Sequence, residues 1–258
     1  MIVAVYQGPS PDGDIAAAFE AIARMLAAAA AAGARLVVFP ELYLPGYNHA
    51  GIPVLAQSAG GAWERRLADL ARTAGCALAI GLAERDGDVL RNTALVFDGT
   101  GRELARYRKV QLYGPREQAL FVPGDRLCLF DLDGIRCGLM ICYDVEFAPL
   151  VRANAAAGAA LLIVPTANPV PFHHVPRLTV PAQAVNHGVI IAYANLCGPE
   201  GDLVYSGGSC IVGPDGAMLA SAGPGAALLI ADLAPAFAVP AAMRSTQLAD
   251  LRPLTPEG

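Results

Sequence analysis

Three side chains able to perform covalent chemistry each follow a short apolar run of the sequence. Glu41 comes after Val-Val-Phe-Pro, Lys109 after Leu-Ala-Arg-Tyr-Arg, and Cys142 after Gly-Leu-Met-Ile. Active sites of α/β proteins assemble at the carboxyl ends of strands, so we expect the three side chains to meet there. A carboxylate, an ammonium group and a thiol placed together can activate the sulfur as a nucleophile.

Lys109 is the single lysine of the chain, and the other 17 of its 18 basic residues are arginines. A lysine at a strand end is ordinarily a solvated edge charge. That interpretation is weakened here because arginine fills every other basic position. Arginine carries a broad, permanently charged fork, whereas lysine carries a compact ammonium group. We therefore expect a role at position 109 that needs a small cation.

Glu41 and Cys142 also have ordinary interpretations when each is taken alone. Glu41 could be a local capping carboxylate. Most of the six cysteines, which form no C-x-x-C pair, are expected to be small buried hydrophobic residues. Against this interpretation for Cys142 stand the polar residues Tyr143 and Asp144 directly after its apolar run. The three signals are weak singly and much stronger as a set.

Composition limits the class of protein. A net charge of −5 and a pI near 5.3 leave no basic stripe for nucleic acid. The apolar run 21–39 is interrupted by Arg24, Gly33 and Arg35, so a membrane span is not expected. The first residues lack the charged region of a signal peptide. We expect a cytoplasmic protein without a metal or other cofactor, acting on a small molecule.

Apolar runs alternate with helical stretches along the whole chain, which predicts one α/β domain over residues 1–258. Hairpin-like pieces argue against a purely parallel sheet, and no G-x-G-x-x-G motif follows the first strand. A mixed sandwich of two sheets with outer helices fits this order best. Strands are predicted over 2–7, 35–41, 76–84, 92–98, 102–109, 127–133, 135–142, 160–167 and 188–195, with three more within 208–233; helices are predicted over 14–32, 62–74, 147–157 and 176–187.

Three segments of the chain, FPELYLPGYN, YRKVQLYGPREQALFVPGD and GLMICYDVEF, resemble the signature segments of the nitrilase-like carbon–nitrogen hydrolases. Their order and spacing also match, with 68 residues from Glu41 to Lys109 and 33 from Lys109 to Cys142. The similarity runs from Ala4 to the terminal LADLRP, whose last residue is Pro253.

The resemblance implies a role for each matched residue. Glu41 would be the general base, Lys109 the catalytic lysine, Cys142 the nucleophile, and Glu117 a second glutamate that orients the lysine and substrate. The ordinary alternative for Glu117 is a loop carboxylate paired with Arg116 or Arg126. Lys109 and the backbone N–H of Tyr143 are the expected oxyanion donors. The resemblance also implies a four-layer αββα sandwich and a homodimer or larger homo-oligomer.

Substrate preference follows from the residues after the cysteine. Relatives that bind N-carbamoyl amino acids carry arginines there, and this chain has none before Arg152, which favours an uncharged or amine-bearing amide. Nitrilases usually have Trp-Glu where this chain has Tyr-Asp. The runs YGPREQALFVPGD, CYDVEF, VPTANP and AYAN-x-CG most resemble the subgroup with 5-aminopentanamidase and an R-stereoselective amidase. The residues implied to bind substrate are Tyr47, Glu146, Asn168, Phe172 and Tyr193.

The prediction is therefore an amidase that forms a cysteine thioester, and an N-carbamoyl amidohydrolase or a nitrilase is the alternative. A non-catalytic family member would lack a triad residue, and a pyridoxal phosphate enzyme would carry a Gly/Ser-rich phosphate cup. Adjacent His173 and His174 are interpreted as loop residues at the entrance of the site rather than metal ligands. Relatives often have Phe-Pro-Glu where this chain has Phe147-Ala148-Pro149, so the local helix start is in question.

Overall fold

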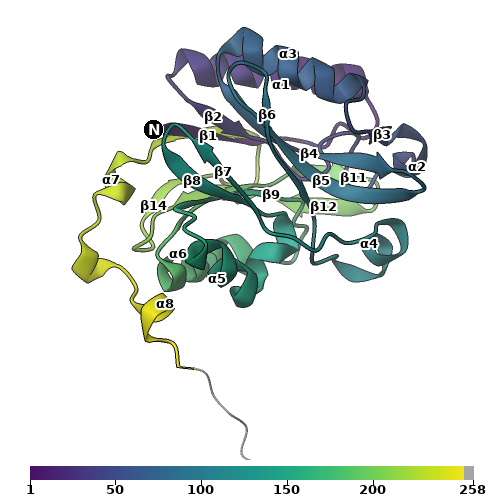
Figure 1. The fold of residues 1–258 in the computed structure, drawn as a ribbon. Helices are drawn as coiled ribbons and strands as arrows, with labels where there is room; N and C mark the ends of the chain where they lie inside the picture. Colours follow the sequence, from purple (N-terminus) through teal and green to yellow (C-terminus); the bar gives the residue numbers. More distant parts are fainter. Residues whose placement is uncertain (253–258) are drawn as a thin grey trace, which may run out of the picture.

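The computed structural model describes residues 1–252 as two face-to-face sheets with helices on both outer sides (Figure 1). Helices α1 (Ile15–Ala31) and α3 (Ala62–Ala74) cover the first sheet, and α5 (Ala148–Ala156) and α6 (Val180–His187) cover the second. The predicted four-layer αββα sandwich is confirmed. Pro253, the last residue of the similar segments, lies outside the described residues.

Each sheet mixes parallel and antiparallel pairs. The first has the order β15 (Ala227–Asp232), β1 (Ile2–Gln7), β2 (Leu36–Val38), β4 (Ala77–Asp86), β5 (Val89–Phe97), β6 (Glu103–Arg108), with β3 (Gln57–Ser58) also pairing with β4. The second has the order β14 (Met218–Ser221), β13 (Cys210–Val212), β10 (Ile190–Ala194), β9 (Leu161–Pro165), β8 (Ile135–Leu139), β7 (Cys128–Leu132).

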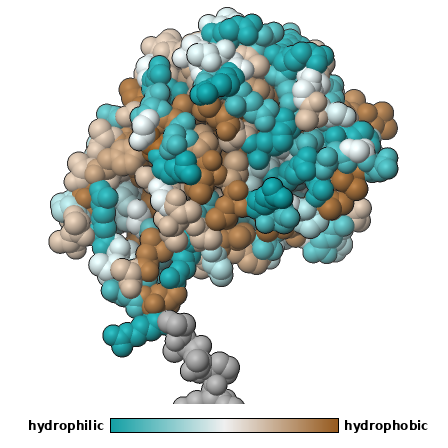
Figure 2. Space-filling view, viewed as in Figure 1, coloured by the Kyte–Doolittle hydropathy of each residue, from teal (hydrophilic) through white to brown (hydrophobic). Residues whose placement is uncertain are grey.

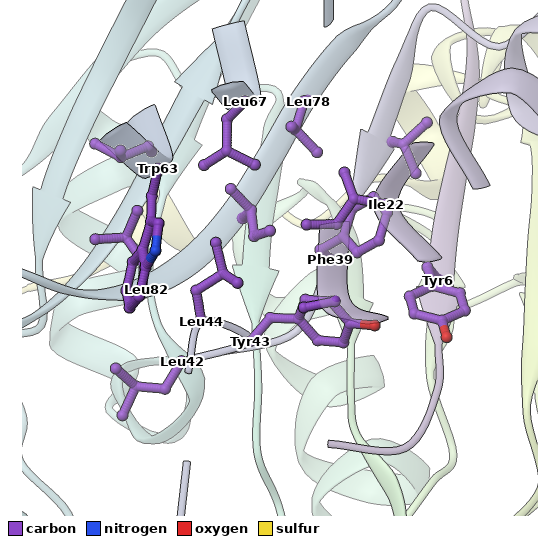
Figure 3. Close-up of a cluster of buried hydrophobic side chains, with 14 of the residues drawn as sticks. Tyr6, Ile22, Phe39, Leu42, Tyr43, Leu44, Trp63, Leu67, Leu78 and Leu82 are labelled. Carbon is purple, nitrogen blue, oxygen red and sulfur yellow. The ribbon is translucent and has the colours of Figure 1, made fainter. Parts of the chain in front are cut away.

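Three hydrophobic clusters fill the spaces between the four layers. The first lies between α1, α3 and the first sheet, and Figure 3 shows Ile22, Trp63 and Leu67 pointing toward strand residues such as Leu78. The second lies between the sheets, and the third between the second sheet and the helices α5 and α6. Successive strand side chains point to opposite faces, so each central strand contributes to two clusters.

Local sequence signals account for the start of α1 and the end of α3. The Asp14 side chain caps α1 by accepting a hydrogen bond from the Ala17 N–H at 2.9 Å. Gly75 ends α3 in the left-handed conformation that glycine adopts without strain.

Figure 2 shows hydrophobic residues lying among hydrophilic ones on the face viewed in Figure 1. In the described part of the chain, no helix combines the length and apolar character needed to cross a membrane.

Several short elements were not predicted. They are α2 (Ile52–Leu55), strand β3, α4 (Gly114–Leu120), the hairpin β11 (Cys197–Glu200) and β12 (Leu203–Ser206), α7 (Ala234–Phe237), a 3₁₀ turn (Ala241–Met243) and α8 (Gln247–Asp250). The predicted strand 135–142 ends at Leu139, and Cys142 instead opens a 3₁₀ helix, η1 (Cys142–Glu146). The predicted helix 176–187 begins with a π-helical turn, Val175–Thr179. Helix α5 still starts at Ala148, because Pro149 suits the first turn.

Candidate active site

Lys109 lies between two buried carboxylates. Its Nζ donates to Glu41 Oε1 at 2.7 Å and to Glu117 Oε1 at 2.8 Å, and all three side chains are almost completely buried. Strand β6 ends at Arg108, and the Lys109 backbone is held by hydrogen bonds to Asn92 and Gly124. The structure thus brings the predicted base, lysine and second glutamate into one cluster.

Electrostatics keep Lys109 charged in this cluster. Burial alone would lower the pKa of its ammonium group, but the carboxylates of Glu41 and Glu117 outweigh burial and raise it above the ordinary value. A buried cation with two adjacent anions carries a permanent local positive charge. Such a charge can stabilise negative charge that develops on a neighbouring atom.

Both carboxylate oxygens of Glu117, the second glutamate, accept hydrogen bonds from other residues of the protein. Glu117 Oε1 accepts from the Tyr47 hydroxyl at 2.6 Å as well as from Lys109, and Oε2 accepts from the Tyr113 N–H at 2.9 Å. Neither of the two arginines considered as partners takes part, since Arg116 instead donates to the Tyr47 carbonyl oxygen at 2.6 Å. Glu117 is therefore placed to hold Lys109 rather than to bind a ligand directly.

Glu41 has one occupied oxygen and one free oxygen. Oε1 accepts from Lys109 and from Asn92 Nδ2 at 2.7 Å, whereas no residue in 1–252 donates to the buried Oε2. Burial raises the pKa of Glu41 to about 7, and the positive charge of Lys109 opposes this shift. A carboxylate with a pKa near neutrality and a free oxygen is suited to accept and return a proton.

Packing fixes the position of Glu41. The next residues, Leu42, Tyr43 and Leu44, are buried in the cluster of Figure 3. Strand β4 passes very close to them, because a Cβ added at Gly81 would lie 2.4 Å from the Leu42 nitrogen and 2.6 Å from the Glu41 Cα. Only glycine allows this approach, so the backbone of the base is held from both sides.

Cys142 adopts a positive φ of 45° at the start of η1. L-residues rarely take this conformation, and it occurs at sites where the surrounding structure imposes it. The side chain is partly exposed and lines a cavity, which excludes the sealed core position of an inert thiol. Burial and the negative charge of Glu41 raise the pKa of the Cys142 thiol, while Lys109 and the Ala167 N–H act in the opposite direction. The resting sulfur is therefore a thiol that needs a base.

Asp144 connects the cysteine helix to the lysine segment. Its carboxylate accepts from the Ile141 N–H at 3.0 Å, the Gln111 N–H at 2.7 Å and the Tyr107 hydroxyl at 2.9 Å. These contacts fix the backbone on both sides of the site. Asp144 and Asn92 are contributors that sequence reasoning did not assign to the site. Asn92 lies in the middle of β5, where nothing in the local sequence indicates its role.

The cavity at Cys142 has a volume of about 240 Å³, and four of the five predicted substrate-binding residues line it. Tyr193 does not, because its side chain is fully buried in the cluster between the second sheet and helices α5 and α6. Tyr143, the predicted backbone oxyanion donor, lines the cavity beside Cys142. His174 lines it too, whereas His173 lines a different surface pocket. The full lining is Tyr47, Tyr113, Cys142, Tyr143, Glu146, Ala167, Asn168, Pro169, Phe172 and His174.

A buried hydrogen-bond network holds one wall of the cavity. The Asn195 side chain accepts from the Asn168 N–H at 2.7 Å and donates to the Asn168 carbonyl oxygen at 3.1 Å. Asn168 Nδ2 in turn donates to the Phe172 carbonyl oxygen at 2.9 Å. The loop that presents these two residues is therefore rigidly positioned by a side chain from the end of β10. Residues 1–252 contain no group of three or more His, Cys, Asp or Glu side chains that could hold a metal ion.

Comparison with known proteins gives consistent matches over most of the chain. The family model described as "Carbon-nitrogen hydrolase" matches residues 2–242. A "Hydrolase in pqqF 5'region" of Pseudomonas protegens is 39% identical over 238 residues, covering 90% of this chain and 82% of the relative. An "(R)-stereoselective amidase" of a Pseudomonas species is 35% identical, covering 73% of this chain and 69% of the relative.

Solved structures agree with these relatives. The crystal structure of an amidase from Nesterenkonia sp. is 40% identical, with a TM-score of 0.89, and the match covers 98% of this chain and 93% of that one. With the family model spanning nearly the whole chain, the protein belongs to the carbon–nitrogen hydrolase family of the nitrilase superfamily, whose members hydrolyse carbon–nitrogen bonds other than peptide bonds.

Proposed function

We propose that the protein hydrolyses small aliphatic carboxamides to a carboxylic acid and ammonia through a thioester on Cys142. The observation that carries this proposal is the Lys109 ammonium group, buried between Glu41 and Glu117 and near enough to Cys142 that Lys109 and Glu41 both influence the pKa of its thiol, which lines a small cavity. This arrangement supplies a nucleophile, a base for its proton and a fixed positive charge. Those are the components that acyl transfer from an amide requires.

In the first half of the reaction, the Cys142 sulfur attacks the amide carbonyl carbon as its proton passes to Glu41 Oε2, the oxygen without a partner. The carbonyl oxygen becomes an oxyanion, which Lys109 and the Tyr143 N–H stabilise. The intermediate then collapses, the C–N bond breaks, and Glu41 returns the proton to the nitrogen. Ammonia leaves and the acyl group stays on the sulfur.

In the second half, a water molecule attacks the thioester carbonyl carbon while Glu41 takes one of its protons. The C–S bond breaks, the sulfur regains a proton from Glu41, and the carboxylic acid is released. Splitting amide hydrolysis into these two steps replaces one slow reaction by two easier ones. The pKa of Glu41, raised to about 7 by burial, suits both directions of proton transfer.

Structural relatives support an amide of small size. A cysteine-to-alanine variant of the Nesterenkonia amidase was crystallised in complex with butyramide, and a double variant with acrylamide. A further variant carries the acetamide moiety of fluoroacetamide on its active-site cysteine. The cavity of about 240 Å³ in the present protein is smaller than the pockets of about 300–1,000 Å³ that bind drug-sized ligands, and suits molecules of this size better.

Negatively charged amides fit the cavity poorly. Another relative is a "2-oxoglutaramate amidase" of Bacillus subtilis, 30% identical, whose substrate carries a carboxylate. No arginine or lysine lines the present cavity, and Arg152 lies in a separate surface pocket. Glu146 adds negative charge instead. A free substrate carboxylate would therefore be repelled and left without a partner.

The proposal is tested by ammonia release over a panel of neutral amides, a carbamoyl amine and a nitrile of matched chain length. We expect the highest kcat/KM for an amide, because the proposed oxyanion donors, Lys109 and the Tyr143 N–H, stabilise the oxygen of a carbonyl substrate. Carbon dioxide released together with ammonia would identify the carbamoyl reaction. Turnover of the nitrile alone would overturn the amidase proposal.

The pH profile should show one acidic limb. Below a pH of about 7, Glu41 gains a proton, so it cannot accept one from Cys142, and kcat/KM should fall about tenfold per pH unit. Above that pH the carboxylate is available and the rate should level off, since the Cys142 thiol stays protonated in this range. Initial rates on an uncharged amide at constant ionic strength measure this. A profile that stays flat well below neutrality would contradict the role of Glu41.

A further inference from the structure

Asn92 contacts two residues of the active site, one through its side chain and one through its backbone. Its Nδ2 donates to Glu41 Oε1 at 2.7 Å, and its carbonyl oxygen accepts from the Lys109 N–H at 2.8 Å. The second hydrogen bond continues the pairing of β5 with β6 by one residue beyond Arg108, where β6 ends. A single residue of β5 thus fixes the backbone of the lysine relative to the carboxylate of the base.

The side-chain contact also determines which oxygen of Glu41 is free. Oε1 accepts from Asn92 Nδ2 and from Lys109 Nζ, both at 2.7 Å, whereas no residue in 1–252 donates to Oε2. A carboxylate held by one donor can still turn about its terminal torsion, which is broad and roughly two-fold. Two donors on the same oxygen restrict this rotation, so Oε2 keeps one direction although no described residue binds it.

The amide of Asn92 is only half used, which a purely structural role does not explain. The residue is 1% exposed, and its Oδ1 has no hydrogen-bond donor among residues 1–252. The buried amide of Asn195 shows the structural pattern, because its oxygen accepts from the Asn168 N–H and its nitrogen donates to the carbonyl oxygens of Asn168 and Gly207. A buried polar atom without a partner lowers stability, so an apolar side chain would suit position 92 better if packing alone decided it.

We propose that Asn92 is a positioning residue of the amide hydrolysis, which turns Glu41 so that Oε2 faces the thiol of Cys142. Asn92 does not line the cavity, so it acts through Glu41 and not on the substrate. The inference rests on the proposed amidase function and adds to it the group that orients the base. Orientation matters because every proton transfer of the proposed reaction needs Oε2 within hydrogen-bond reach of the reacting atom.

The same contact acts on the charge of Glu41. Burial raises the pKa of Glu41 to about 7, and the charge of Lys109 and the hydrogen bond from Asn92 act in the opposite direction. The negative charge of Glu117 adds to the effect of burial. Three more titratable groups interact with the charge of Glu41, and burial raises the pKa of each, so they stay protonated near neutral pH: Cys142, Tyr47 and Tyr205. Removing the Asn92 donor should raise the pKa of Glu41, because the ionised carboxylate loses a hydrogen bond.

The test compares the pH profile of kcat/KM on butyramide between the wild type and Asn92→Leu, in which an apolar side chain with the same branching replaces the amide. The midpoint of the acidic limb should move up by about one pH unit, because Glu41 stays protonated to a higher pH. Above this limb kcat should be about ten- to a hundredfold lower, since the base is no longer held in place, while KM changes little. Asn92→Ala, which removes the amide without adding atoms, should give the same shift.

Asn154→Leu is the matched control. Asn154 lies on α5 and is also 1% exposed, its Nδ2 donates to the Leu150 carbonyl oxygen at 3.0 Å, and its Oδ1 likewise has no partner in the described part of the chain. This variant removes a buried, half-used amide away from the active site, so it should keep the wild-type midpoint and KM. Thermal unfolding of every variant establishes that folded proteins are compared.

The possible outcomes separate this inference from the function on which it rests. An unchanged midpoint in Asn92→Leu and Asn92→Ala, or an equal shift in Asn154→Leu, would overturn the positioning role. Failure of both Asn92 variants to fold would assign the residue to the stability of the sheet and would overturn that role as well. Absence of ammonia release from butyramide and the other neutral amides by the wild type would instead overturn the amidase function.

Discussion

Replacing Lys109 by arginine is expected to remove nearly as much activity as replacing it by alanine, although the positive charge is kept. Loss of one oxyanion donor typically lowers the rate about 10²–10³-fold, or roughly 3–4 kcal/mol. We expect Lys109→Arg and Lys109→Ala each to lower the rate by at least this factor. The result would distinguish the effect of the cation's shape on activity from the effect of its charge.

The reason lies in the space around the ammonium group. Nζ is within 2.8 Å of one oxygen from each of two carboxylates, and the residue as a whole is 1% exposed. A guanidinium group is planar, has five donors and is wider than an ammonium group, so it cannot take this position without displacing Glu41, Glu117 or the substrate. Lys109→Ala additionally leaves two buried carboxylates without a cation, which costs about 3–5 kcal/mol of stability when a buried pair is broken.

Steady-state kcat/KM on one neutral amide, together with thermal unfolding of each variant, measures both effects. Arg136→Lys, a surface ion-pair residue with a half-exposed side chain, provides the control for an exchange between the two cations. A Lys109→Arg protein that folds and keeps more than about a tenth of the wild-type rate, a loss below about 1.4 kcal/mol, would refute the geometric argument.

Glu41→Gln is expected to abolish turnover while leaving a sulfur that can still be alkylated, because loss of the Glu41 negative charge removes one cause of the raised pKa of Cys142 and leaves Lys109 beside it. The amide oxygen can still accept hydrogen bonds from Lys109 and Asn92, so the fold around Oε1 is kept. The amide nitrogen in place of Oε2 cannot accept the thiol proton or return it to ammonia. Since general acid–base catalysis contributes about 10²–10⁴-fold per step and Glu41 serves in both halves of the reaction, a loss of about 10⁴-fold or more is expected.

Intact-protein mass spectrometry distinguishes loss of the base from loss of the nucleophile. Incubation with acrylamide should add one acrylamide mass to the Glu41→Gln protein, through a C–S bond to Cys142. Cys142→Ala should show neither turnover nor the added mass at this site. Glu64→Gln, at a carboxylate on α3 paired with Arg106, is a control for removing a largely buried glutamate away from the cavity. Substantial turnover by Glu41→Gln would assign the proton transfer to another group.

A mixed sandwich of two sheets and the meeting of Glu41 with Lys109 could be predicted from local signals, whereas the four-layer αββα arrangement and the place of Glu117 were implied by the resemblance to the family. Apolar runs with β-branched residues predict the central strands, and each run ends beside the reactive residue. Cys142 shows the limit of this reasoning, because its strand ends at Leu139 and the cysteine opens a 3₁₀ helix with positive φ. A single sequence carries no direct signal for a strained backbone at a non-glycine residue.

Contacts between distant elements were the part that could not be predicted. Asn92 reaches Glu41 only because β5 lies beside β4 in the first sheet, and Asp144 reaches Gln111 only because η1 packs on the end of β6. Tyr193 was assigned to the substrate site by the resemblance to the family. In the structure, alternation along β10 turns its ring toward helices α5 and α6.

The burial of the only lysine side chain has a consequence for the handling of this protein. Reagents that acylate the ε-amine of lysine find no accessible target side chain while the sandwich is folded, and opening of the site exposes one per chain. The rate at which that single position becomes labelled therefore reports how often the catalytic cluster comes apart.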